Sequence, residues 1–228
     1  MRFDRRRRRF LFAALLAGGG AALHAQEPYR TFGPAVEAGV THLTFSGADF
    51  TRHDDFNTDQ NHRVDPALGF HLSGVFSARP RLLLAVGVEN TSHKTDYASD
   101  NLHVLQFYVE PRFMIAEAGR ATGYAFAHLS VLHATQQISL FDSNNTLVSG
   151  NATQTGSAFG GGLGVQVAIR PHVYGLVVAQ YNTELLGDID FDGTHVADSS
   201  DRGSGLLIRA GIGVNLTGWE TALKSFGR

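Results

Sequence analysis

The feature that most constrains this chain is a repeated alternation of apolar residues with small or polar ones. After residue 30 it recurs in eight stretches, at 33–46, 66–77, 80–92, 101–116, 121–141, 156–170, 172–187 and 203–217. Successive side chains of a strand point to opposite faces, so each stretch predicts a strand with one apolar and one polar face. The pattern predicts an all-β chain, folded as a single eight-stranded antiparallel up-and-down β-barrel.

The gaps between these stretches alternate in length. Short gaps follow the second, fourth and sixth stretches, at 77–80, 117–120 and 170–171. Long polar gaps follow the others, at 47–65, 93–100, 142–155 and 188–202. Short turns on one side and long loops on the other are typical of barrels that span a membrane, where the long loops face outward.

The two faces differ in polarity. In the last stretch Leu206, Ile208 and Ile212 share one side, while Arg209 and Gly211 share the other. Burying an unpaired charge costs several kcal/mol, so we expect the charged side to form ion pairs in the barrel lumen and the apolar side to face lipid. Eight strands leave room only for side chains, which predicts a plugged lumen rather than an open pore. The expected lumen network is Glu37, Glu89, Glu110, Arg112 and Arg209.

A soluble barrel of the lipocalin type would also alternate, but with the faces reversed. It would carry an apolar cavity for a ligand and stay in the periplasm. Two observations oppose this alternative: the charged residues lie on the glycine-rich side of their strands, and the loops are sorted into short and long ends.

The N-terminal segment predicts export. Residues 2–9 contain six arginines, an apolar stretch follows at 10–23, and Ala25 offers a cleavage site. We therefore expect a signal peptide at 1–25, a lead-in at 26–32, the barrel at 33–217 and a short tail at 218–228. The residues Arg7 to Leu11 also fit a twin-arginine signal, which leaves the export route open. The apolar stretch is shorter than the roughly 20 residues of a membrane-spanning helix.

Charge and cysteine content exclude several functions. Removing residues 1–25 takes away six arginines and Asp4, so the formal charge falls from −2 to −7. An acidic chain does not suit nucleic-acid binding, which needs clustered cations. The chain has no cysteine, which excludes disulfides and thiol chemistry.

Three segments resemble the OmpA-type outer-membrane β-barrel domain: 32–40, 86–90 and 205–216. The resemblance implies a monomer in the outer membrane of a Gram-negative-type cell, surrounded by outer-membrane lipids. Within 209–216, the pattern from Arg209 through Gly211 and Val214 to Leu216 is similar to the last-strand signal that the outer-membrane assembly machinery reads. It differs in having aliphatic residues in place of aromatic ones, and in the residues 217–228 that follow it.

One pair of residues suggests catalysis. His128 and Ser130 resemble the His-x-Ser of outer-membrane lipid A deacylases, in which the histidine acts as a general base for the serine. The asparagine and glycine context of those enzymes is missing here, and strand alternation turns both side chains toward the lumen. We therefore expect no enzyme, and keep a lipid A deacylase-like esterase as the alternative to a structural or surface-interaction role of the loops.

No cofactor is expected, although two acidic segments could hold a metal. Asp188, Asp190 and Asp192, followed by Gly193, have the spacing that begins a calcium-binding loop, but Ser199 stands where a closing glutamate is needed. The alternative is an acidic, solvated loop. The first long loop carries a similar set, which predicts either metal ligands or a polar loop: His53, Asp54, Asp55, Asp59 and His62.

Overall fold

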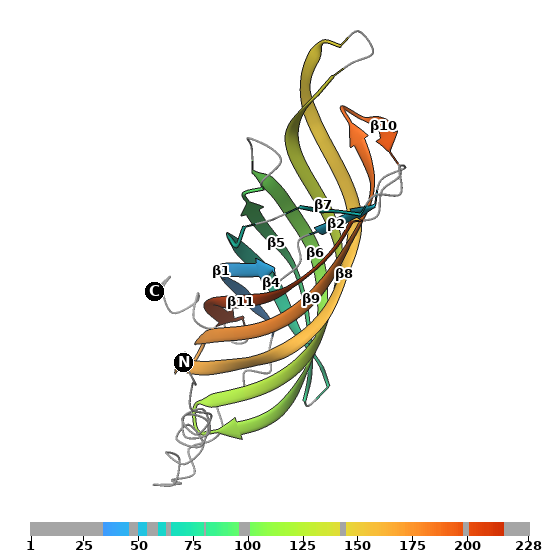
Figure 1. Cartoon of the computed structure of the whole chain (residues 1–228). Coiled ribbons are helices and arrows are strands. Elements are labelled where there is room, and N and C mark those ends of the chain that lie inside the picture. Colours follow the sequence, from blue (N-terminus) through green and yellow to red (C-terminus); the bar gives the residue numbers. More distant parts are fainter. Residues whose placement is uncertain are drawn as a thin grey trace, which may run out of the picture.

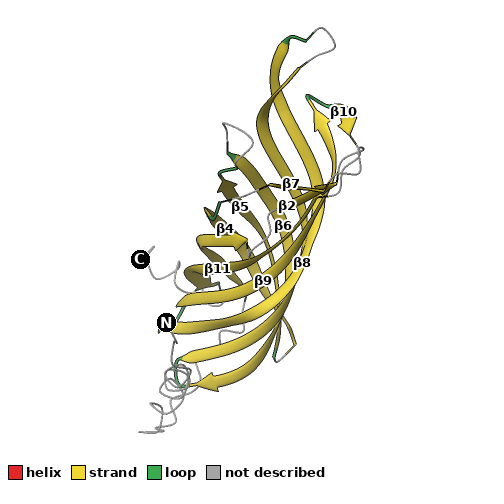
Figure 2. Ribbon diagram, viewed as in Figure 1, coloured by secondary structure: helices red, strands yellow, loops and turns green. Residues whose placement is uncertain are grey.

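A computed structural model describes residues 34–45, 50–53, 59–62, 65–79, 81–95, 101–141, 145–197 and 201–216. The predicted signal peptide, the lead-in and the C-terminal tail lie outside these residues. Strands make up nearly all of the described chain (Figure 2). Within those ranges there is no helix long and apolar enough to cross a membrane.

Eight long strands form a closed ring (Figure 1). Each pairs antiparallel with the next, and the last pairs with the first, so that the sheet has no free edge around the barrel. The predicted eight-stranded up-and-down barrel is therefore confirmed. In ring order the strands are β1 (Ala35–Phe45), β4 (Ala67–Arg79), β5 (Leu82–His93), β6 (Leu102–Ala118), β7 (Ala121–Phe141), β8 (Leu147–Arg170), β9 (Val173–Phe191) and β11 (Asp201–Asn215).

One end of the barrel carries tight turns, between β4 and β5, β6 and β7, and β8 and β9. The other end carries two small hairpins: β2 (Phe50–His53) with β3 (Asp59–His62), and β10 (Thr194–Ala197), which folds back on β9. The turn between β9 and β10 consists of Asp192 and Gly193, whose φ angles are 48° and 79°. Two left-handed residues form the two-residue turn that suits the twist of a hairpin.

The segments 142–155 and 188–202, predicted as loops, are largely strand. β7 and β8 pair continuously from Ala121 opposite Val167 to Phe141 opposite Leu147. β9 runs on to Phe191. The prediction missed these extensions because polar and small residues outnumber apolar ones in both segments, so that the apolar alternation is weak. Backbone pairing does not depend on side-chain polarity.

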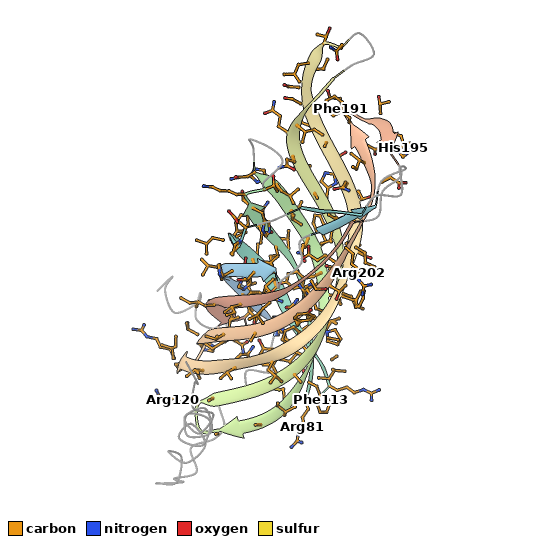
Figure 3. The ribbon with its side chains drawn as sticks, viewed as in Figure 1. Arg81, Phe113, Arg120, Phe191, His195 and Arg202 are labelled. Carbon is orange, nitrogen blue, oxygen red and sulfur yellow. The ribbon has the colours of Figure 1, made fainter. Side chains whose placement is uncertain are left out.

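The outer surface is apolar and the inside is polar, as predicted. Large apolar side chains point outward on all eight strands; Leu68 on β4 is 72 % exposed and Val131 on β7 is 62 % exposed. Phe113, also on the outer surface, is labelled in Figure 3. The lumen holds charged, amide and hydroxyl side chains between two apolar clusters, one near the tight turns and one near the opposite end. A lipid-facing barrel requires this arrangement of faces, and a soluble barrel requires the reverse.

Candidate lumenal site

Arg112 on β6 links two carboxylates in the lumen. Its Nη1 donates to both carboxylate oxygens of Glu37 on β1, at 2.8 and 2.9 Å. Its Nε and Nη2 donate to Oε2 of Glu110, at 3.2 and 3.1 Å. All three side chains are at most 1 % exposed. Such forked, charge-assisted hydrogen bonds are among the strongest polar contacts in proteins, and here water has little access to weaken them.

Arg209 on β11 extends this network to the opposite wall. Its Nη2 donates to Oε1 of Glu110 and to the side-chain oxygen of Gln180, and its Nε lies 3.5 Å from Oε2 of Glu89. His128 Nδ1 lies 2.9 Å from Oε1 of the same Glu110. Glu110 is therefore shared by two arginines and one histidine.

The structure brings together the five charged residues that the sequence singled out. They form one continuous chain across the lumen, which we call the lumen network: Glu37, Arg112, Glu110, Arg209 and Glu89. The strands that carry them, β1, β5, β6 and β11, are held to one another through the interior as well as through the sheet.

Neutral donors, which the sequence did not reveal, complete the site around Glu37. Tyr174 Oη donates to Glu37 at 2.9 Å, Gln166 Nε2 at 3.1 Å and Ser73 Oγ at 3.3 Å. These residues belong to β9, β8 and β4. With Arg112, they give Glu37 partners on four other strands, so this carboxylate joins five of the eight walls of the barrel.

Three tyrosines in the lumen each lie over a glycine of the neighbouring strand. The pairs are Tyr108 with Gly87, Tyr124 with Gly164 and Tyr174 with Gly213. Each ring occupies the space that a Cβ on its glycine would need, so these glycines permit a close approach of ring to backbone. The Arg112 guanidinium lies 5.2 Å from the centre of the Tyr124 ring, and that of Arg209 lies 5.1 Å from the centre of the Tyr108 ring. These separations fit cation–π contacts.

A fourth buried carboxylate, Glu184 on β9, was missed. It is 1 % exposed and accepts a hydrogen bond from Gln106 Nε2 at 3.2 Å. The sequence around it has apolar residues on both faces of the strand, which hides which face points inward. The inward positions of Gln180 and Asn182, at the same spacing of two, were the signal that could have revealed it.

The two candidate catalytic residues both face the lumen but contact different partners. His128 is joined to Glu110, whereas Ser130 Oγ donates to Oε1 of Gln106 at 3.3 Å. A histidine acting as the base for a serine must lie within hydrogen-bond reach of its hydroxyl, and no hydrogen bond joins these two described side chains. Both are buried and away from the lipid-facing surface.

The candidate calcium ligands lie along a hairpin rather than around a point. Asp188 and Asp190 are on β9, and Asp192 is in the β9–β10 turn, where its Oδ1 accepts a hydrogen bond from the Asn151 backbone N–H at 2.9 Å. Asp190 Oδ1 lies 3.6 Å from His195 Nδ1. Across the described ranges, no three acidic or histidine side chains are placed to hold a metal ion. In the other acidic segment, Asp54, Asp55 and the side chains of His53, Asp59 and His62 lie outside the described part.

A closed ring, an apolar exterior and a lumen filled by an ionic network define a β-barrel of the membrane-spanning class. No family model and no curated protein matches the chain. Among solved structures, the outer-membrane protein OprG of Pseudomonas aeruginosa has a TM-score of 0.53 and 11 % identity, covering 80 % of this chain and 95 % of that one.

Two further solved structures match most of the chain at lower TM-scores. Neisserial surface protein A gives a TM-score of 0.47 at 18 % identity, over 80 % of this chain and 96 % of that one. The attachment invasion locus protein Ail of Yersinia pestis gives 0.42 at 14 % identity, over 79 % and 99 %. The closed ring of eight strands and the similarity to OprG give the chain the fold of an eight-stranded outer-membrane β-barrel, and they do not single out the OmpA-type domain.

Proposed function

We propose that this chain is a monomeric outer-membrane barrel that presents an extended hairpin at the cell surface, with a structural or surface-interaction role. The observation that carries the proposal is the length and polarity of the hairpin formed by β7 and β8. A membrane-spanning strand needs about 9–11 residues. β7 has 21 residues and β8 has 24.

The part of this hairpin beyond the lipid-facing band is mostly polar on its outer face. The outward apolar residues of the barrel wall end at Val131 on β7 and at Phe159 on β8, and beyond them Leu147, next to the tip, is the exposed apolar side chain on this face of the described β8. Beyond them lies what we call the β7–β8 ribbon, residues 133–141 and 147–157. Its outward cross-strand pairs are His133 with Thr155, Thr135 with Thr153, Gln137 with Asn151 and Ser139 with Ser149. The last pair shares a hydrogen bond of 2.7 Å.

The ribbon is long enough to extend well clear of the membrane. About ten residues separate Val131 from the end of β7, which at about 3.3 Å per residue gives roughly 30 Å of hairpin. Figure 1 shows this hairpin reaching beyond the other strands at that end of the barrel. The hydroxyl, amide and imidazole side chains of these outward pairs suit contacts with other polar molecules at the surface.

Other roles for the barrel have less support. The buried lumen network fills the interior at mid-height, which argues against an open pore. The apolar outer face does not suit a soluble ligand-binding barrel. The separate partners of His128 and Ser130 give no support to a deacylase, so the proposal assigns no catalysis. The proposed role also includes recognition of residues 209–216 by the outer-membrane assembly machinery. These residues belong to β11, the last strand, which closes the ring by pairing with β1.

The absence of cysteine allows a direct test of surface exposure. Ser149→Cys places a thiol on the ribbon, and Ser77→Cys places an exposed one at the tight-turn end. On intact cells, we expect a membrane-impermeant maleimide to label Ser149→Cys, and to label Ser77→Cys only after the outer membrane is permeabilised. Membrane pelleting and a heat-dependent gel shift should show that both variants are folded. Labelling of Ser77→Cys alone, or recovery of the protein in the soluble fraction, would refute the proposal.

A further inference from the structure

Four exposed arginines surround the tight-turn end of the barrel. We call them the arginine rim: Arg79, Arg81, Arg120 and Arg170. Every tight turn carries at least one of them. Among the described residues of these turns, Glu117 is the single carboxylate, and no rim arginine forms an ion pair with a described residue. Figure 3 labels Arg81 and Arg120 at the end opposite His195 and Phe191.

The rim lies where the apolar outer surface ends. Arg170 directly follows Ile169, which is 54 % exposed on the outer face. Arg81 comes three residues before the outward Leu84, and Arg79 three residues after the outward Phe76. The polar headgroup layer occupies about 5–8 Å on each side of a bilayer. A few residues of tilted strand, together with the length of an arginine side chain, place the guanidinium groups in this layer.

The opposite end of the barrel carries both signs of charge. Asp188, Asp190 and Asp192 are exposed on and beside the hairpin of β9 and β10, and Lys94 and Arg202 are exposed at the same end. The described tight turns, by contrast, are predominantly positive, and their charge is distributed over three turns rather than gathered in one pocket. A distributed ring suits many small ligands that each contact one or two arginines, rather than one compact ligand. Guanidinium groups bind phosphate through paired hydrogen bonds.

We infer that the arginine rim binds the phosphate groups of anionic phospholipids in the leaflet that contacts the tight turns. The inference rests on the proposed membrane location. A cation near an anionic membrane surface gains about 1 kcal/mol, which corresponds to about fivefold enrichment of anionic lipid at each arginine. The rim would thus surround this end of the barrel with anionic lipid.

The test measures lipid enrichment at the rim in vesicles. The vesicles consist of phosphatidylcholine with a minor fraction of phosphatidylglycerol, and one of the two lipids carries a donor fluorophore. An acceptor fluorophore on Ser77→Cys measures energy transfer from that lipid. Enrichment is the transfer from labelled phosphatidylglycerol relative to the transfer from labelled phosphatidylcholine. We expect about fivefold enrichment of phosphatidylglycerol, which high salt should reduce. Combining Arg79→Gln, Arg81→Gln, Arg120→Gln and Arg170→Gln should remove it. The matched control Arg202→Gln changes an exposed arginine at the other end, and should leave the enrichment unchanged.

Each other outcome has a distinct meaning. No enrichment in the parent protein, or equal enrichment in the rim variant and the control, would overturn the inference while leaving the barrel proposal intact. Rim-dependent binding of inorganic phosphate to the detergent-solubilised protein, without lipid enrichment, would overturn it in favour of free phosphate. A parent protein that fails to insert, judged by the absence of a heat-dependent gel shift, would refute the membrane location and the inference with it.

Discussion

Replacing Arg112 by methionine tests whether the lumen network holds the barrel together. The Arg112 side chain is 1 % exposed and donates four hydrogen bonds, two to Glu37 and two to Glu110. Its loss leaves Glu110 with Arg209 and His128 as partners. Glu37 keeps only neutral donors, so its charge is buried without compensation.

The expected cost follows from that uncompensated charge. Removing one member of a buried ion pair costs about 3–5 kcal/mol, whereas replacing both members by neutral groups of similar volume is often close to neutral. Arg112→Met should therefore lower the free energy of unfolding by about 3–5 kcal/mol. Adding Glu37→Gln should restore about half of this loss or more, because the glutamine retains hydrogen bonding without carrying a charge.

Urea unfolding in detergent micelles, followed by gel mobility and circular dichroism, measures these differences as shifts in midpoint. Arg202→Met, at an exposed position, serves as the control and should unfold like the parent protein. The reasoning fails if Arg112→Met unfolds within about 1 kcal/mol of the parent. It also fails if the double variant is as unstable as the single one. In that case the uncompensated charge of Glu37 would not be the cause of the lost stability.

Three further results are expected. Gly164→Ala should lower the free energy of unfolding by about 1–3 kcal/mol, because the new Cβ would enter the Tyr124 ring. The control Gly123→Ala, whose Cβ would make only ordinary contacts, should not lower it. Equal melting temperatures of the two variants would contradict this prediction. Calorimetric titration with calcium should give a flat trace, because the candidate ligands lie along a hairpin; a saturating trace abolished by Asp190→Asn would restore that site. In planar bilayers the parent protein should show no stepwise conductance, and regular steps would show that the lumen network does not block the barrel.

The sequence was sufficient to predict the ring and the direction of most side chains, because side chains alternate between the two faces of a strand. On β6 this alternation is regular, so Glu110 and Arg112 could be placed in the lumen from the sequence alone. Their pairing could not be predicted. Arg112 and Glu37 belong to strands separated by β4 and β5, and whether they lie at one height depends on the stagger of every strand between them.

Side chains without charge or strong hydropathy were the ones that sequence reasoning missed. Gln166 lies on the glycine-rich face of β8, but an uncharged amide gave no reason to single it out as a partner of Glu37. Tyr174 is on β9, where apolar residues on both faces hide which one points inward. The fit of Tyr124 over Gly164 depends on cross-strand register, which no single strand reveals. Residues 147–155, the β8 part of the β7–β8 ribbon, were predicted as a loop because polar and small residues predominate there, although their backbone pairing with β7 is uninterrupted.

The uninterrupted pairing of the β7–β8 ribbon also determines how its length can change. Each residue of β7 has one partner on β8 from the barrel wall to Phe141 opposite Leu147. Adding or removing equal numbers of residues on both strands at the far end keeps every lower pair, and every inward and outward position, as it is. A deletion on one strand alone would slip the register and turn side chains to the wrong face. The ribbon is therefore a suitable place to graft foreign peptides for display, provided that they enter between the two strands at the tip.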